Sequence, residues 1–390
     1  MNIESLTGNW NYPTSMRFGC GRIRELPDAC GELGIRRPLL VTDPGLAALP
    51  MTEQTVAICD STGLPTTVFS DIKPNPVGAN VEDGVLAYRD AGCDGVIAYG
   101  GGSALDVGKA VALMAGQTRP LWDFEDIGDW YTRVDEAGMA PVVAVPTTSG
   151  TGSEVGRASV IIDEQAGNKK IIFHPGMLPG RVVADPELTV GLPRGLTAAV
   201  GMDALSHNLE ALCSPLCHPM ADGIAMEGIR LVHTALQQAV ADGSNLVARS
   251  RMMAASTMGA TAFQKGLGAM HALSHPIGAE LDAHHGLCNA IVMPYVLVFN
   301  RSAIETKMVA LARLLDLPNA SFDAVLHWIL EMRQAIGIAE TTKALGMTES
   351  LCDKLAPKAA VDPSAATNPI ELDTGNLRSL YRRSLHGDLS

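Results

Sequence analysis

The sequence feature that most constrains the fold is the stretch from Gly268 to Ala290, GAMHALSHPIGAELDAHHGLCNA, which holds four of the ten histidines. His271 and His275 are four residues apart, so a helix would present them on one face, one turn apart. Pro276 predicts that the helix bends or loses its regular hydrogen bonds just after His275, and Gly286 predicts that a helix ends or the chain turns there. Because neutral imidazole is the commonest metal ligand in proteins, this density of histidines favours a metal site over separate core or surface histidines.

A second cluster lies upstream, in the segment GMDALSHNLE from Gly201 to Glu210. Asp203 and His207 are again four residues apart, so a helix would present a carboxylate and an imidazole side by side. Such a pair often arises by chance and usually lies on the protein surface without binding a metal. Together with the histidine-rich stretch, it predicts one site in which three nitrogens and one oxygen hold a metal ion.

These clusters carry a resemblance to a known family. Asp203, His207, His271 and His285 have the order and spacing, 4, 64 and 14 residues, of the metal ligands of the iron-containing (group III) alcohol dehydrogenases. The words GMDALSH, HALSHPIGA and HHGLCNA resemble that family's motifs. The family has proline before its last ligand, where this chain has His284, so the neighbouring histidines are alternatives as ligand. The position directly before Gly286 favours His285.

The resemblance extends over essentially the whole chain, and a length of 390 residues most simply makes two domains. Strand-like and helix-like segments alternate in the first half, which is typical of an α/β domain. From Leu196 onward, helical patterns rich in Ala, Leu and Met replace them. We therefore expect an α/β dinucleotide-binding domain over residues 1–192 and an all-α metal-binding domain over 193–390, the fold that this family shares with dehydroquinate synthase. The boundary is predicted near Gly191 to Gly195.

Two segments of the first half are suited to a nucleotide. Asp43 ends the predicted strand in Pro38–Gly45 and could accept a hydrogen bond from a ribose, or it could simply cap its turn. In DGVIAYGGGSALDVGKAVAL, a strand over 95–99 leads through a glycine loop over 100–103 into a helix from Ala104. Backbone amides at such a junction can bind a pyrophosphate. Ser103 and Asp106 have the spacing of a capping box.

A third segment, PVVAVPTTSGTGSEV, repeats this logic with a strand over 142–145 and a loop rich in hydroxyl groups. It contains the family word P-T-T-x-x-T-G-S-E, and Phe69 to Pro76 resembles the family's D-x-x-x-N-P segment. Lys169 matches the family's cofactor-side lysine by position, with Lys170 as its possible substitute. The candidate cofactor residues are Asp43, Gly101, Gly102, Ser103, Thr147, Thr148, Thr151 and Lys169.

Composition limits the partners and the compartment. The net charge of −13 argues against nucleic-acid binding, which needs clustered Lys and Arg. We expect no membrane partner, because no apolar run is long enough to cross a bilayer, and no signal peptide. The scattered cysteines form no disulfide framework, and the pair Cys213 and Cys217 has no second pair to complete a zinc site. Reduced thiols in the cytoplasm are therefore favoured. The oligomeric state stays open, with a homodimer as one possibility.

The resemblance implies an NAD-dependent oxidoreductase that interconverts a primary alcohol and its aldehyde. In the family, Fe²⁺, or Zn²⁺ in some members, polarises the substrate oxygen while hydride passes between the carbinol carbon and the nicotinamide. His275, one turn from His271 and not needed as a ligand, is the candidate for a catalytic proton relay. The substrate is a small alcohol or aldehyde whose identity the motifs leave open.

Two other interpretations compete with this one. A lyase related to dehydroquinate synthase would also combine NAD and a metal, but it needs several basic residues for a phosphorylated substrate. The helical half has few Lys or Arg near the metal motifs. A non-catalytic, metal-stabilised protein would have no use for both a glycine-rich and a threonine-rich loop.

Overall fold

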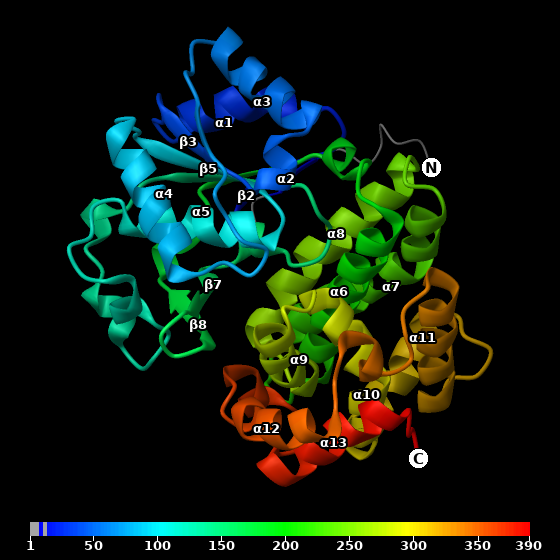
Figure 1. Ribbon diagram of the computed structural model, residues 1–390. Coiled ribbons are helices and arrows are strands. Elements are labelled where there is room, and N and C mark those ends of the chain that lie inside the picture. The colour runs from blue at the N-terminus through cyan, green and yellow to red at the C-terminus, as the bar shows by residue number, and fades with distance from the viewer. Residues whose placement is uncertain (1–7, 11–13) are drawn as a thin grey trace. The chain divides into compact units, whose positions relative to one another are not determined.

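The structure, a computed structural model drawn in Figure 1, describes residues 8–10 and 14–390. The chain divides into two compact units. The first unit extends to Thr148 and resumes over Gly152–Gly191, and the second takes Ser149–Thr151 and Leu192–Ser390. The first unit contains a largely parallel sheet with helices, and the second is helical. The predicted fold class is therefore confirmed.

The first unit is built on one seven-stranded sheet of described residues in the order β1-β2-β9-β6-β5-β3-β4. Its strands are β1 (Gly8–Trp10), β2 (Ser15–Phe18), β3 (Pro38–Val41), β4 (Thr67–Phe69), β5 (Gly95–Gly100), β6 (Val142–Pro146) and β9 (Arg181–Ala184). The pairs are parallel except that of β1 with β2. Strands β3, β5 and β6 are buried throughout, as expected for a parallel sheet with helices on both faces.

Helices lie on both faces of the sheet (Figure 1), and the alternation of side chains along each strand directs them to both faces. Ile97 and Tyr99 share a core cluster with α1 residues such as Leu26. Ala98 points the other way, where Gly108 of α5 comes so close that an added Cβ would lie 2.7 Å from the Ala98 Cβ. The helices of this unit are α1 (Leu26–Glu32), α2 (Pro44–Ala47), α3 (Pro50–Ser61), α4 (Gly78–Asp90) and α5 (Gly102–Met114).

A separate antiparallel hairpin, β7 (Ala158–Asp163) with β8 (Asn168–Phe173), was not predicted from the sequence. In β7, buried and partly exposed residues alternate, the period of a strand with one covered face. The register pairs Ala158 with Phe173 and Asp163 with Asn168. Lys169 and Lys170 are neighbours on β8, so their side chains leave opposite faces of the hairpin.

The capping box predicted at Ser103 and Asp106 is wrong. Helix α5 begins two residues earlier than expected, at Gly102, and its N-cap is Gly101, which makes no side-chain hydrogen bond. The Ser103 hydroxyl instead donates to the carbonyl of Pro74. Asp106 accepts from the Ser153 hydroxyl at 2.5 Å and from the Val160 amide at 2.9 Å. These tertiary partners take both side chains away from the helix end.

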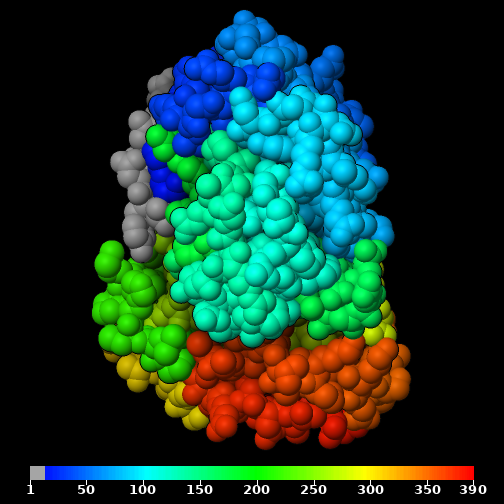
Figure 2. All heavy atoms as spheres, turned by 90° about the vertical axis from the view of Figure 1, so that its left-hand side faces the viewer, coloured from blue at the N-terminus to red at the C-terminus, as the bar shows by residue number. Residues whose placement is uncertain are grey.

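The second unit is assembled around α6, whose residues from Thr197 to Cys213 are all buried. A helix that is covered on every side must lie inside its unit, and α6 packs against α7, α8 and α10. The helices are α6 (Arg194–Cys213), α7 (Pro219–Ala241), α8 (Leu246–Ala262), α9 (Ala269–Leu281), α10 (His285–Leu314), α11 (Phe322–Ile336), α12 (Glu349–Ala360) and α13 (Thr374–His386). Helices α12 and α13 pack together and form the orange and red surface in Figure 2.

No apolar run long enough to cross a bilayer was expected from the sequence, but helix α10 is, alone among the described helices, long and apolar enough to do so. In the structure, 67% of its most apolar window is buried within the protein. Such burial is typical of a core helix, and Cys288, Ile291 and Met308 are among its core residues. The apolar character of α10 is therefore accounted for by packing inside the helical unit.

Candidate active site

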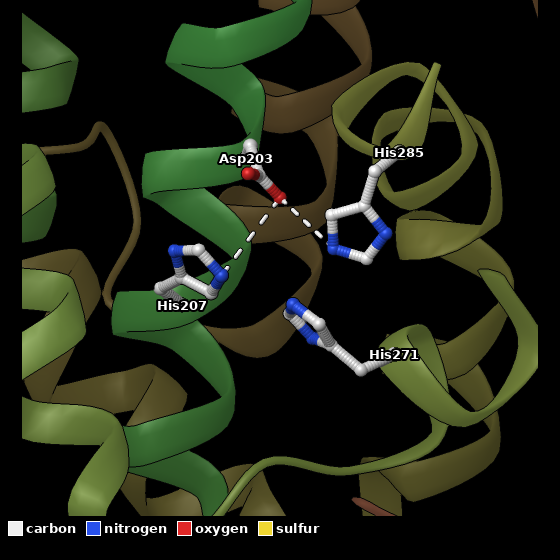
Figure 3. A group of neighbouring side chains, drawn as sticks. All are labelled: Asp203, His207, His271 and His285. Atoms are coloured by element: carbon white, nitrogen blue, oxygen red, sulfur yellow. Dashed lines mark ion pairs between the residues drawn. The ribbon is translucent and has the colours of Figure 1, made fainter. Parts of the chain in front are cut away.

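Four side chains from three helices of the second unit converge, as Figure 3 shows. Asp203 and His207 come from α6, His271 from α9 and His285 from the start of α10. One potential ligand atom from each lies within 4.8 Å of the others. The Asp203 carboxylate oxygen Oδ1 is 3.9 Å from His207 Nε2 and 3.7 Å from His285 Nε2. Residues up to 82 positions apart in the chain thus form one group.

A glycine allows the third helix to approach. Gly286 lies in the first turn of α10, so the prediction that it ends a helix is wrong. A Cβ at Gly286 would lie 2.5 Å from the Ala199 carbonyl oxygen and 2.9 Å from the Asp203 Cβ. Any side chain there would push α10 away from α6 and separate His285 from Asp203.

The two adjacent histidines have different positions. His285 is partly buried and belongs to the group of four. His284 is the N-cap of α10, and its Nδ1 accepts a hydrogen bond from the Leu287 amide at 3.4 Å. The geometry therefore points to His285, not His284, as a ligand candidate.

Burial and hydrogen bonding prepare the imidazoles for a cation. Burial lowers the pKa of His207 to about 4, so this ring is neutral at pH 7. Its Nδ1 lies 3.2 Å from the Gly150 carbonyl oxygen, and donation there leaves the Nε2 lone pair for a ligand bond. The His271 ring is also buried. Although burial acts in the opposite direction, the adjacent Glu210 carboxylate raises the pKa of His271.

The donor set fits a divalent transition metal. Three imidazole nitrogens and one carboxylate oxygen suit Fe²⁺ or Zn²⁺. Ligands about 2.0–2.2 Å from such an ion lie roughly 3–4 Å from one another, so a spacing within 4.8 Å needs only a small contraction. Three of the four residues are buried, which keeps competing water away.

Three residues near this group were missed by the sequence analysis. The Nδ2 amide of Asn289 donates to Asp203 Oδ1 at 2.9 Å, and Glu210 Oε2 lies 2.6 Å from His271 Nδ1. Both follow a ligand candidate at helical spacing, Asn289 four residues after His285 and Glu210 three after His207. That spacing could have identified them. The third residue, Asp362, had no such local signal.

His275 lies beside the group of four but is not part of it. Its ring stacks on His285 with 5.2 Å between centroids, and its Nδ1 is 2.8 Å from Asp362 Oδ2. Although burial acts to raise it, the neighbouring His275 lowers the pKa of Asp362. His275 and Asp362 form a polar pair one helical turn from His271.

In the first unit, the predicted cofactor residues follow the carboxyl ends of adjacent parallel strands. Asp43 comes after β3, Gly101 after β5 and Thr147 after β6, and these strands are neighbours in the sheet. In open α/β sheets, nucleotides bind at this edge. Gly100 has φ 148°, in a region that favours glycine, and its carbonyl accepts from the Thr147 amide at 2.9 Å. Thr148 lies beside Gly101.

The segment Pro74–Asn75 connects two other predicted cofactor residues. Its Pro74 carbonyl accepts the Ser103 hydroxyl, and the Asn75 side-chain oxygen accepts from Lys169 Nζ at 3.0 Å. Lys170 is engaged elsewhere, in ion pairs with Glu125 at 3.2 Å and Asp163 at 3.0 Å. The geometry thus favours Lys169 over its neighbour as the cofactor-side lysine.

Asp43 and Thr151 have positions that the sequence did not fix. Asp43 is the N-cap of α2, and its Oδ1 accepts from the Leu46 amide at 2.9 Å. Thr151 belongs to the short segment Ser149–Thr151, which is part of the helical unit, whereas Thr147 and Thr148 belong to the first unit. The loop after β6 therefore contributes residues to both units.

A buried lysine of the first unit was also missed. Lys109 of α5 is 2% exposed and lies 3.3 Å from Asp106, and its Nζ donates to the Ala158 carbonyl. Burial lowers the pKa of Lys109, which the Asp106 charge opposes. Together, Lys109 and Asp106 tie α5 to the start of the β7–β8 hairpin. Lys109 follows Asp106 by three residues, a helical spacing that could have predicted this ion pair from the sequence.

Two family models cover most of the chain. Residues 13–186 match the model described as iron-containing alcohol dehydrogenase, and residues 197–385 match that of the C-terminal part of the same family. The chain belongs to the iron-containing alcohol dehydrogenases. It is 40% identical to a 4-hydroxybutyrate dehydrogenase of Cupriavidus necator, over 96% of this chain and 99% of that protein.

Solved structures agree with this assignment. A crystal structure of 1,3-propanediol oxidoreductase superimposes with a TM-score of 0.91 at 33% identity, over 97% of this chain and 99% of the other. A sulfoacetaldehyde reductase from Bifidobacterium kashiwanohense, solved in complex with NAD⁺, has a TM-score of 0.87 at 30% identity, over 97% and 98% of the two chains.

The protein is therefore an NAD-dependent alcohol dehydrogenase of the type that uses Fe²⁺, and its homologues act on small alcohol or aldehyde substrates. The predicted family, enzyme class and cofactors are confirmed. The comparisons favour the dehydrogenase over the lyase related to dehydroquinate synthase and over a non-catalytic metal-stabilised protein.

Proposed function

We propose that this alcohol dehydrogenase divides its work between residues 1–192, which bind NAD, and residues 193–390, which bind the metal and position the alcohol. The metal ligands are Asp203, His207, His271 and His285. The observation that carries this assignment is the convergence of their ligand atoms within 4.8 Å, in a group of which three residues are buried. Fe²⁺, when bound, would act as a Lewis acid and make the hydroxyl group of the substrate more acidic.

The NAD pyrophosphate is held by the amides of Gly101 and Gly102 at the start of α5, where helix amides have no partner within the helix. Ser103, Thr148 and Thr151 add hydroxyl groups, and Thr147 fixes the loop through its bond to Gly100. Lys169, oriented by Asn75, adds a positive charge for the phosphates. Asp43 binds the adenosine ribose with the carboxylate oxygen that does not cap α2.

His275 carries the proton of the substrate hydroxyl. The Asp362 carboxylate at 2.8 Å accepts from Nδ1, which leaves the Nε2 lone pair to receive a proton in the oxidative direction. In the reductive direction the same nitrogen returns it. The Asp362 charge stabilises the imidazolium during the transfer, as carboxylates do for catalytic histidines.

The substrate is a short primary alcohol with a second polar group at its far end. Two similar proteins support this class: a 4-hydroxybutyrate dehydrogenase at 40% identity and a 1,3-propanediol oxidoreductase at 33%. The names of both describe a terminal hydroxyl group with a second oxygen function three or four carbons along the chain. Cytoplasmic location is supported by buried cysteines that form no disulfide, such as Cys30, Cys59 and Cys352.

Reduction of an aldehyde panel tests these assignments. The full-length protein is purified anaerobically, its iron and zinc are quantified, and NADH oxidation is followed with succinic semialdehyde, 3-hydroxypropanal and unsubstituted aldehydes of equal length. We expect kcat/KM to be higher for the aldehydes with the second oxygen function. Equal or higher values for the unsubstituted aldehydes would reject the substrate class but leave the metal and NAD assignments untouched.

A further inference from the structure

A buried carboxylate lies behind the metal-ligand candidates. Glu210 of α6 is 4% exposed and makes contact with the first turn of α9 through both oxygens. Its Oε2 lies 2.6 Å from His271 Nδ1, and its Oε1 accepts from the Met270 amide at 2.6 Å. Gly268 provides the room, because a Cβ there would lie 3.1 Å from Oε1.

This contact selects one form of the His271 ring. A carboxylate can only accept hydrogen bonds, so the proton between Glu210 and His271 resides on Nδ1 when the ring is neutral. The lone pair is then on Nε2, the nitrogen on the side of Asn289 and the other ligand candidates. The opposite tautomer would direct an N–H at the position of a cation.

We propose that Glu210 is a positioning residue of the metal centre, which holds His271 in the tautomer and orientation that bind the ion. The proposal rests on the metal assignment made above. Ligating histidines are usually oriented in this way, and loss of the partner typically weakens metal binding by about 10–100-fold. Here the same carboxylate also fixes the backbone of α9 one residue before the ligand, so ring and helix are aligned by a single group.

The need for a carboxylate follows from its two acceptors. In Glu210→Gln, one oxygen becomes an NH₂ group, although the shape is kept. If the amide oxygen accepts from His271, the NH₂ group faces the Met270 N–H, and two donors oppose each other. If the amide is turned, the NH₂ group faces His271 Nδ1 and favours the tautomer with the proton on Nε2. Either arrangement disturbs the ligand.

The chain offers a matched control at the same helix end. Asn368 is also buried, and its side-chain oxygen accepts from the Ala269 amide at 3.1 Å, one residue before Met270. It has no hydrogen bond with a ligand candidate; its other partners are Asn300 and the Ile370 carbonyl. Asn368→Ala therefore loosens the start of α9 without touching the ring of His271.

The experiment measures zinc retention by full-length, zinc-loaded protein in competition with a chelator. We expect Glu210→Gln to weaken zinc binding by about 10–100-fold and Asn368→Ala to change it by less than threefold. A ratio of ten or more between the two effects supports the proposal. A smaller ratio overturns it, because Glu210 would then act only as part of the helix end. Failure of the metal assignment is separate: zinc would remain equally bound in Asp203→Ala.

A second measurement needs no variant of Glu210. In zinc-loaded wild-type protein with ¹⁵N-labelled histidine, the His271 signals, identified by their loss in His271→Gln, report which nitrogen carries the proton. We expect the proton on Nδ1. A proton on Nε2 overturns the proposal, also in the case that Glu210→Gln does not fold.

Discussion

The two units provide their chemistry by different means. In the helical unit, side chains from α6, α9 and α10 converge on one point, and each contributes a specific atom. In the α/β unit, much of the proposed cofactor site is main chain, at the glycine turn after β5 and the loop after β6. A metal ion needs particular donor atoms, whereas a dinucleotide is bound by many weaker contacts. Single substitutions should therefore have larger effects in the helical unit.

Removal of one metal ligand should have the largest effect. In Asp203→Ala or His271→Ala, metal affinity and turnover should both fall by more than the roughly 10–100-fold typical of residues that only support ligands, so that the purified variant should contain little metal. Metal analysis together with aldehyde reduction measures both. Full metal content and turnover in either variant would show that these helices do not hold the ion.

The adjacent histidines sharpen the comparison within one turn of chain. His285→Ala should lose metal, because its ring belongs to the group of four. His284→Ala should retain it, because His284 is outside the group of four and caps α10 through a 3.4 Å hydrogen bond. Loss of a cap costs about 1 kcal/mol of stability, visible as a small decrease of Tm. The reverse pattern of metal loss would reassign the ligand to His284.

The same difference explains what could be predicted from the sequence. The pair Asp203 and His207 could be predicted because residues four apart lie side by side on one face of a helix. The fold class was equally accessible through its alternating segments. The capping box predicted at Ser103 and Asp106 was wrong because both side chains bind tertiary partners, Pro74 and Ser153, instead of capping the helix. Such long-range partners leave no periodic trace.

Gly286 and Asp362 illustrate the remaining limit. The glycine after His285 suggested a turn. In the structure, a glycine is needed there because α10 passes close to Ala199 and Asp203. Asp362 meets His275 across 87 residues. Neither the close approach at Gly286 nor the contact between Asp362 and His275 can be inferred from the neighbouring residues, because both depend on how separate segments pack.

His275→Ala should have an intermediate effect. It should retain the metal, because His275 is outside the group of four, while turnover falls by about 10²-fold, the low end of general acid–base contributions. Asp362→Asn is the matched variant, since it keeps the shape beside Nδ1 but removes the charge, and it should slow turnover less. Steady-state kinetics across pH measure both effects. An unchanged pH–rate profile in His275→Ala would leave this histidine with a packing role only.

The smallest effect is expected in the α/β unit, for the choice between NAD and NADP. Two unit charges 4 Å apart repel by about 4 kcal/mol at an effective dielectric of 20. Because Asp43 is partly exposed, solvent reduces this value. Since about 1.4 kcal/mol corresponds to tenfold, the wild-type enzyme should prefer NAD by roughly ten- to a hundredfold in kcat/KM.

Two variants separate the charge of Asp43 from its cap on Leu46. Asn is as good an N-cap as Asp, so Asp43→Asn keeps the cap and removes the charge, whereas Asp43→Gly removes both. Both should lose most of the preference, chiefly because NADP improves. If only the Gly variant changes, or if the wild-type enzyme prefers NADP, Asp43 acts through its turn and not through the ribose. A loss of turnover as large as that of Asp203→Ala would contradict the contrast between the two units.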